Sequence, residues 1–346
     1  MNFWKNILLL FLKRGRVNQF TFKEETYKGI DKNDIPIRIY HSKKYTHKSA
    51  ILFLGASPDG EKHKSLNFLA KILTHFGYNV FIPRIPPLMQ LNISNINVNW
   101  MEHIYNDIKR RPDVNKKYIA AVGFSYGGGM LLKASLSKTF MDNPPKTFFL
   151  YGAGCNVDTV LKFITKGEFD YNGNSIKMKP HDWGLTVFFH HFMDEIEFGF
   201  DKTKIKEVIQ LRIQNKKQEA NEKLKLLKGD EFSITNSIIS GNITKDVLDL
   251  VDKTIDQKKH YIDELSCKPI CHKIGPKTFI FHGANDNMVP FSESVQLNQL
   301  IPDSELLISY LFEHKGISSK SNIFKKLKEF IRLINFFKKF DSFHAS

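Results

Sequence analysis

Short apolar runs alternate with segments of helical length along most of this chain, and this alternation constrains the fold more than any other feature. The runs are apolar throughout, as expected for strands buried on both faces, and two of them end at Gly55 and Pro83. Intervening segments carry apolar residues at helical spacing, such as Leu66, Leu69 and Leu73. Strands separated by helices imply parallel pairing through crossover connections. We therefore expect an α/β fold with a mostly parallel central sheet flanked by helices. The predicted strands span residues 50–54, 79–82, 118–122, 147–151, 278–281 and 306–311, after an opening pair at 20–22 and 35–40.

The alternation stops between residues 155 and 272, a segment without any buried-strand pattern. We interpret this segment as a helical cap insertion. It divides the chain into a first half of the α/β core at 1–154, the insertion at 155–272 and a second half of the core at 273–346. Helices within the insertion are predicted at about 202–227, 245–252 and 255–265.

The segment Gly123-Phe124-Ser125-Tyr126-Gly127 lies at the junction between a predicted strand and a predicted helix. Glycines two positions before and after Ser125 permit a turn so tight that side chains there would collide. Such a turn holds the serine hydroxyl above the sheet in a strained backbone conformation. The helix that follows presents its N-terminal N–H groups to developing negative charge. The pattern therefore predicts a nucleophile elbow with Ser125 as the nucleophile.

With this elbow the chain resembles the α/β-hydrolase superfamily, and in particular bacterial members of undefined substrate. In that superfamily the serine, the acid and the histidine follow one another on loops after successive strands. The stretch 281–290 follows a predicted strand and resembles the acid loop, which implies Asp286 as the acid. The stretch 311–316 follows the last predicted strand, which implies His314 as the base. Asp158 is the rival acid, because some members carry the acid after the strand that follows the nucleophile.

An oxyanion hole in this superfamily needs two backbone N–H donors. The resemblance implies Tyr126, directly after the nucleophile, as the first. The second is expected in the loop 55–60, where Ala56 is the favoured donor and Ser57 the alternative. Asp59 precedes Gly60 in this loop and is interpreted as a turn former.

The resemblance implies a serine hydrolase that cleaves a carboxylic ester through an acyl-enzyme on Ser125. His314 would act as the base and Asp286 would orient it. The expected substrate is a small-molecule ester or another acyl compound. A peptidase or thioesterase using the same triad is an alternative, as is a non-catalytic or membrane-associated protein of this fold. Four aromatic residues of the insertion either line an acyl pocket or form the core of the cap: Trp183, Phe188, Phe189 and Phe192.

The charge of the chain is strongly positive, with 51 Lys and Arg against 36 Asp and Glu and a net charge of +15. Such a charge raises nucleic acid and anionic membranes as partners. The lysines, however, lie on helix faces that the fold leaves in water, and neither a glycine-rich phosphate loop nor an aromatic-basic RNA motif is present. We therefore expect no nucleic-acid partner. A hydrophobic fraction of 42% indicates a substantial core and excludes a disordered chain.

The chain has three cysteines, too few for a disulfide framework, which favours a reducing compartment such as the cytoplasm. Cys267, Cys271 and His272 carry side chains that can bind a metal ion. Structural zinc sites need a fourth ligand and a paired knuckle, and the sequence shows neither. We therefore expect no metal ion, and no cofactor motif is present.

Residues 1–16 contain the apolar run 7–12 between basic residues. A membrane-spanning helix needs about 20 apolar residues, so this run is too short to cross a bilayer. Two interpretations stay open: a helix or tail packed on the domain, or a basic amphipathic segment in peripheral contact with an anionic membrane surface.

Overall fold

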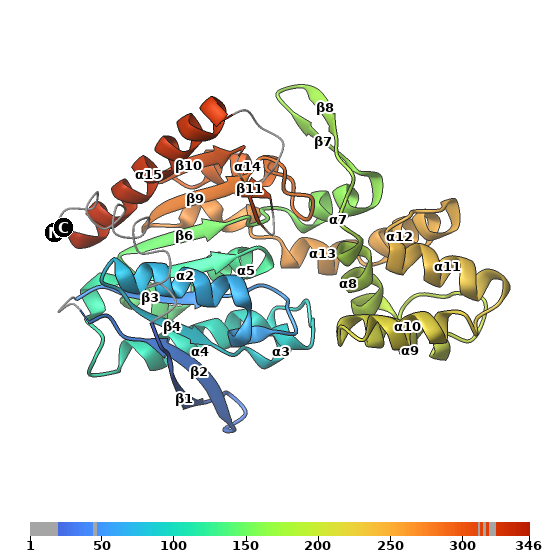
Figure 1. Cartoon of the computed structure of the whole chain (residues 1–346), viewed down its shortest axis with the longest axis horizontal. Helices are drawn as coiled ribbons and strands as arrows, with labels where there is room; N and C mark the ends of the chain where they lie inside the picture. Colours follow the sequence, from blue (N-terminus) through green and yellow to red (C-terminus); the bar gives the residue numbers. More distant parts are fainter. Residues whose placement is uncertain (1–19, 44–46, 311, 314–315, 318–322) are drawn as a thin grey trace.

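The computed structural model describes residues 20–43, 47–310, 312–313, 316–317 and 323–346. Its central element is an eight-stranded sheet in the order β1-β2-β4-β3-β5-β6-β9-β10 (Figure 1). Strands β4, β3, β5, β6, β9 and β10 pair in parallel, whereas β1 and β2 add antiparallel strands at one edge. The predicted, mostly parallel α/β sheet is confirmed. Its strands are β1 (Lys23–Lys28), β2 (Asp34–Tyr40), β3 (Ser49–Phe53), β4 (Asn79–Pro83), β5 (Ile119–Phe124), β6 (Thr147–Tyr151), β9 (Lys277–Gly283) and β10 (Ser304–Ser309).

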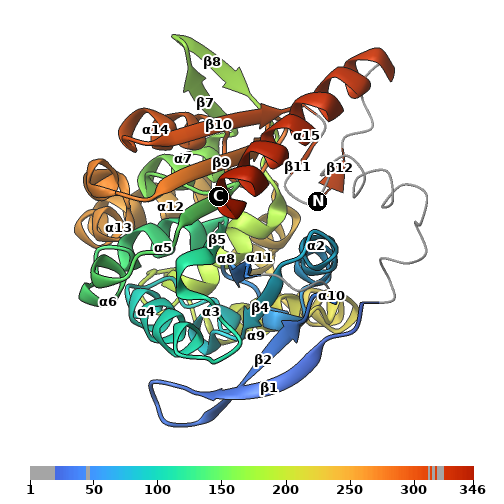
Figure 2. The same cartoon turned by 90° about the vertical axis from the view of Figure 1, so that its left-hand side faces the viewer.

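Helices cover both faces of the sheet, which explains why its middle strands are apolar throughout. Figure 2 shows α2 and α15 on one side of the sheet and α4, α5 and α6 on the other. Side chains alternate between the two faces along a strand, so Leu52 packs in the core under α2 and α15 and Phe53 packs in the core under α4 and α5. These helices are α2 (Lys64–His75), α4 (Ile96–Lys109), α5 (Tyr126–Ala134), α6 (Lys138–Asp142) and α15 (Ile323–Ala345). Shorter elements complete the core: η2 (Gly60–Lys62), α3 (Pro86–Met89), η3 (Lys116–Tyr118), α14 (Ser292–Leu300), β11 (Phe312–Glu313) and β12 (Gly316–Ile317).

The first strand of the sheet does not lie where the sequence predicts it. The prediction at 20–22 is wrong, because β1 spans Lys23–Lys28. Four of its six residues are charged, since an edge strand that faces water has no need of apolar side chains. A search for apolar runs therefore misses it. Its bounds are determined by antiparallel pairing with β2, in which Lys23 lies opposite Ile39.

Between β6 and β9 the chain leaves the sheet and forms mostly helices (Figure 1). We call residues 155–272 the insertion. Their apolar side chains form a core of their own, built around Phe189, Ile205 and Ile238. The elements of the insertion are α7 (Val157–Lys166), β7 (Glu168–Tyr171), β8 (Asn174–Lys177), α8 (Asp182–Phe192), α9 (Thr203–Ile213), α10 (Lys217–Leu224), α11 (Gly229–Ser240), α12 (Lys245–Gln257), α13 (Lys259–Leu265) and η4 (Lys268–Lys273).

Two details of the insertion differ from the prediction. The single helix predicted over 202–227 is wrong, because Asn215 adopts a positive φ of 60° and the chain turns there from α9 into α10. A short hairpin, β7–β8, also lies in a segment predicted to contain helices. Asn172 and Gly173 form its turn, with φ values of 52° and 74°. An Asn-Gly pair is a strong signal for such a turn, so the sequence did carry the information.

The insertion contacts the loops that follow β4 and β9, at the edge of the sheet where the parallel strands end. The N–H of His181 donates a 2.8 Å hydrogen bond to the carbonyl of Asn287. The Tyr261 hydroxyl donates to the carbonyl of Ile93, and the Nδ1 atom of His191 accepts from the Ile93 N–H at 3.4 Å. Across the described ranges, no helix is both long and apolar enough to cross a bilayer. Residues 1–16 lie outside the described residues, so their predicted membrane contact stays a prediction.

Candidate active site

Ser125 occupies the turn between β5 and α5, as the elbow pattern predicts. Its φ and ψ angles are 50° and −131°, a conformation that residues other than glycine rarely adopt. Two hydrogen bonds maintain this turn. The Ser125 N–H donates to the carbonyl of Tyr151 on β6 at 2.8 Å, and the Ser125 carbonyl accepts from the Gly128 N–H at 2.9 Å. The serine is therefore fixed to the neighbouring strand in a strained conformation and is half-buried.

The glycines around Ser125 are required by close backbone approaches. A Cβ atom on Gly127 would lie 2.5 Å from the carbonyl oxygen of Leu54, and one on Gly123 would lie 2.6 Å from the Cα of Gly128. Real Cβ atoms do not approach other atoms so closely. The contact between Gly127 and Leu54 also brings the end of β3 against the elbow. The tight turn and the loop after β3 are thus parts of one packed unit.

The two predicted oxyanion donors are backbone N–H groups of the elbow and of the loop after β3. Tyr126 is the first residue of α5, and N–H groups in the first turn have no acceptor within the helix. The loop after β3 packs on this turn, because a Cβ atom on Gly55 would lie 3.3 Å from the Tyr126 nitrogen. The Ser57 N–H is already used, since it donates to the carbonyl of Leu88 at 3.1 Å. No acceptor for the Ala56 N–H is found among the described residues, so this N–H is available as a donor.

Asp286 lies in the loop after β9 and is 2% exposed. Its Oδ1 atom accepts hydrogen bonds from the N–H groups of Met288 at 2.8 Å and Val289 at 3.0 Å. The Oδ2 atom lies 3.5 Å from Nε2 of His282, a fully buried ring whose Nδ1 is 2.6 Å from the hydroxyl of Ser294. These contacts fix the orientation of the carboxyl group. Nε2 of His282 also lies 3.0 Å from the carbonyl oxygen of Val289, so both ring nitrogens have partners within this loop and α14, and His282 has a structural role here.

Ser125 and Asp286 lie on the same edge of the sheet. In the sheet, Phe124 of β5 pairs with Tyr151 of β6, which in turn pairs with Phe281 of β9. Phe124 and Phe281 are therefore two strand spacings apart, about 10 Å across the sheet. Ser125 directly follows Phe124, and Asp286 lies in the loop after the strand that contains Phe281. Burial raises the pKa of the Tyr151 phenol, and the nearby charge of Asp286 raises it further. The acid is thus within electrostatic range of the strand that anchors the nucleophile.

No protein-family model and no curated protein matches the sequence. The uncomplexed acylaminoacyl peptidase of Pyrococcus horikoshii superposes with a TM-score of 0.53 at 12% identity, over 94% of this chain and 43% of the peptidase. An acylaminoacyl peptidase in complex with Z-Gly-Gly-Phe-chloromethyl ketone gives a TM-score of 0.53 at 13% identity, over 94% of this chain and 43% of that one. An esterase from Exiguobacterium antarcticum gives 0.47 at 14% identity, over 93% of this chain and 99% of that one.

This chain has the α/β-hydrolase fold. It spans less than half the length of these two peptidase structures. At this level of identity the likeness establishes the fold, and the residues of the site carry any conclusion about chemistry.

The predicted base, His314, lies outside the described residues of this chain. The described residues just before it, Phe312 and Glu313, form β11, which lies beside β9. The loop with Asp286 follows β9. The chain that leads to His314 therefore approaches the strand that carries the predicted acid.

The rival acid, Asp158, lies in the first turn of α7, on the insertion side of the fold. Its Oδ2 atom forms an ion pair with Nζ of Lys162 at 2.9 Å, one helical turn further along. Its other oxygen, Oδ1, is buried and has no hydrogen-bond partner among the residues described. Asp286, by contrast, has two N–H donors on one oxygen. The arrangement favours Asp286 as the preorganised carboxylate.

The aromatic residues of the insertion mostly form its core. Phe188, Phe189 and Phe192 of α8 are all buried within the apolar cluster of the insertion, and only Trp183 is partly exposed. Rings packed against each other in this way do not line a pocket, which favours the core interpretation over the acyl-pocket interpretation.

Sequence reasoning missed Glu293, a buried carboxylate near the site. It lies in the first turn of α14, after the Asp286 loop, and is 1% exposed. Its carboxylate accepts hydrogen bonds from the N–H groups of Cys155 at 2.9 Å and Asn156 at 2.7 Å, and from the Thr159 hydroxyl at 2.6 Å. Burial raises the pKa of Glu293, and these hydrogen bonds oppose that effect. No local pattern marks this residue, because its partners lie far away in the sequence.

Proposed function

We propose that this α/β-hydrolase is a serine hydrolase that cleaves a carboxylic ester through an acyl-enzyme on Ser125. The observation that carries the proposal is the conformation of Ser125, with φ of 50° on the turn between β5 and α5. Strained conformations of this kind persist where surrounding structure imposes them, and they concentrate at functional sites. The buried Asp286 at the same edge of the sheet supports the same role.

The reaction would begin with proton transfer from the Ser125 hydroxyl to His314, while the oxygen attacks the ester carbonyl carbon. Asp286 would orient the imidazole and stabilise its cation. The N–H groups of Tyr126 and Ala56 would bind the oxyanion of the tetrahedral intermediate. The C–O bond to the alcohol then breaks as His314 returns the proton to the departing oxygen. Water, activated by His314, would hydrolyse the acyl-enzyme and regenerate Ser125.

A panel of p-nitrophenyl esters of graded acyl length tests the proposal, with matched amide and thioester substrates alongside. We expect turnover of at least one ester, loss of turnover in Ser125→Ala and retention in Ser135→Ala. Ser135 follows the C-terminus of α5, so its variant controls for changes to the same helix. Turnover that survives in Ser125→Ala would contradict the proposal. Faster cleavage of an amide or thioester than of every ester would replace the ester assignment with a peptidase or thioesterase.

We propose further that the protein is cytoplasmic. The second part of this proposal is that residues 1–16 make peripheral contact with an anionic membrane surface. Flotation with anionic and neutral vesicles tests this part, using the full chain and a variant without residues 1–16. Binding to anionic vesicles that disappears on truncation supports it, and binding unchanged by truncation contradicts it.

A further inference from the structure

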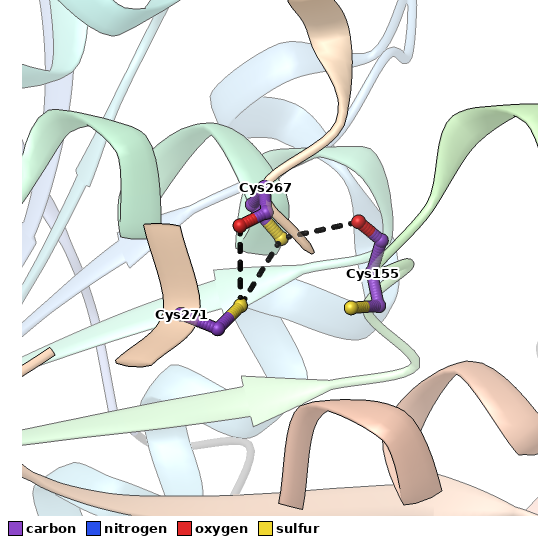
Figure 3. A group of neighbouring side chains, drawn as sticks. All are labelled: Cys155, Cys267 and Cys271. Carbon is purple, nitrogen blue, oxygen red and sulfur yellow. Dashed lines mark hydrogen bonds between the residues drawn. The ribbon is translucent and has the colours of Figure 1, made fainter. Parts of the chain in front are cut away.

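All three cysteines of the chain lie together, although they come from two distant segments (Figure 3). Cys155 follows β6 at the start of the insertion, and Cys267 and Cys271 lie at its end, just before and within η4. The three sulfur atoms lie within 4.8 Å of one another. Their residues are 1%, 1% and 0% exposed, respectively. The sequence did not indicate this group, because Cys155 is separated from Cys267 by 112 positions.

The separation of the sulfur atoms fits coordination to one metal ion. The Sγ atoms of Cys267 and Cys271 are 4.0 Å apart. A metal bound by thiolates at about 2.3 Å requires sulfur–sulfur distances of about 4.0 Å in a trigonal plane and about 3.8 Å in a tetrahedron. The third sulfur, from Cys155, needs a shift of less than about 1 Å to complete either arrangement. Only small side-chain rotations therefore separate the present positions from a coordination shell.

The surroundings supply no fourth ligand. Within the described part of the chain, no histidine, aspartate or glutamate brings a ligand atom into this group. The polar atoms that contact the thiols are backbone carbonyl oxygens, those of Gly154, Cys155 and Cys267. Structural zinc is almost always four-coordinate, whereas soft thiolate ligands also select Cu(I). A donor set of three thiolates alone therefore suits a soft, three-coordinate ion.

We propose that Cys155, Cys267 and Cys271 bind one Cu(I) ion in trigonal thiolate coordination. Binding forms three Cu–S bonds and releases three thiol protons to solvent, with no change in oxidation state. The charge of Lys133, on α5, interacts with Cys267 and partly offsets the negative charge of the three thiolates.

The position of the three cysteines determines which parts of the fold a bound ion would connect. Its ligands come from the first residue of the insertion and from the last turn before the chain returns to β9, so the ion joins the two ends of the insertion. The site also adjoins the nucleophile helix, because a Cβ atom on Gly129 would lie 3.7 Å from Sγ of Cys267. Copper binding would therefore hold the base of the insertion against α5.

Anaerobic titration of the reduced full chain with Cu(I), in competition with bicinchoninate, tests the proposal. We expect one Cu(I) per chain to be retained, and X-ray absorption to show three sulfur neighbours at about 2.3 Å. These measurements use the native chain and do not depend on a variant. Because the chain has three cysteines in all, thiolate ligation can come only from this group.

Cys155→Ala provides the second measurement and separates thiolate from methionine ligation. It should lower the sulfur count from three to two and weaken binding by roughly 100-fold. Met141→Leu is the matched control, since that methionine lies on α6 and is exposed to solvent, and it should bind copper as the native chain does. Failure to retain Cu(I), a shell of nitrogen or oxygen atoms, or four-coordinate Zn(II) held in preference to Cu(I) would each overturn the proposal.

Discussion

Arg84 and Glu61 form a bidentate ion pair at the end of the loop that carries the predicted oxyanion donor Ala56. The Arg84 Nε and Nη2 atoms donate to the two carboxylate oxygens at 2.8 and 2.6 Å, and Glu61 is 1% exposed. Burial alone would raise the pKa of Glu61, but the hydrogen bonds from Arg84, a backbone hydrogen bond and the charges of Arg84 and Arg38 together outweigh burial and lower the pKa. Glu61 directly follows the loop 55–60 and Arg84 follows β4. The pair therefore ties the Ala56 loop to the sheet.

Replacing this carboxylate tests whether the pair positions the loop. Glu61→Gln weakens the charged hydrogen bonds to Arg84 and should lower the free energy of unfolding by about 2–3 kcal/mol in urea titrations. If the loop carries an oxyanion donor, kcat should fall while KM changes little. Glu24→Gln removes an exposed partner of Arg38 and should cost less than about 1 kcal/mol, with kcat unchanged. Equal effects of the two variants on kcat would contradict a positioning role.

The elbow glycine provides a test of packing. Gly127→Ala would place a Cβ atom 2.5 Å from the Leu54 carbonyl oxygen, so the end of β3 or the start of α5 must move. We expect the free energy of unfolding to fall by about 1–3 kcal/mol. Gly275→Ala is the control, because nothing lies within 4 Å of the Cβ position there. A Gly127→Ala protein as stable as the Gly275→Ala protein would show that the elbow is not packed as described.

The assignment of the acid is tested by a pair of isosteric variants. Asp286→Asn keeps an oxygen that can accept from Met288 and Val289 but removes the charge that would stabilise the imidazolium. We expect kcat to fall by about 10⁴-fold. Asp158→Asn should change kcat little, because Asp158 is paired with Lys162 on α7. A large loss for Asp158→Asn together with a small one for Asp286→Asn would transfer the role of the acid to Asp158.

The last helix carries a histidine that should make stability depend on pH. His344 is 0% exposed, its Nε2 lies 2.8 Å from the carbonyl oxygen of Tyr118, and burial lowers its pKa from 6.5 to about 4. The folded protein therefore binds this proton more weakly than the unfolded chain. Stability should fall as the pH drops below about 6.5 and should keep falling until about pH 4, by about 3 kcal/mol in total.

The contribution of His344 is isolated by comparison with His344→Gln, which can still donate to the Tyr118 carbonyl. Urea unfolding at a series of pH values between 7 and 4 should show a steeper loss of stability for the native chain than for the variant. Parallel curves for the two proteins would contradict the lowered pKa.

The parts of the fold that the sequence predicted are those with local patterns. The elbow was predicted because Gly123, Ser125 and Gly127 are constrained by the turn that contains them. The buried strands were predicted because both faces of the sheet are covered. The exposed edge strand β1 and the break at Asn215 were missed, since pairing and a single positive φ determine them. The grouping of Cys155 with Cys267 and Cys271 depends on how the ends of the insertion meet, and no local pattern carries that information.

The central claim is that Ser125 is an activated nucleophile, and covalent labelling tests it most directly. The native chain should react with a fluorophosphonate probe to give one adduct, detected by intact mass and located by peptide mapping at Ser125. Ser125→Ala should not react, whereas Ser135→Ala should react like the native chain. An unlabelled native protein that is demonstrably folded, or an adduct on another residue that persists in Ser125→Ala, would contradict the account.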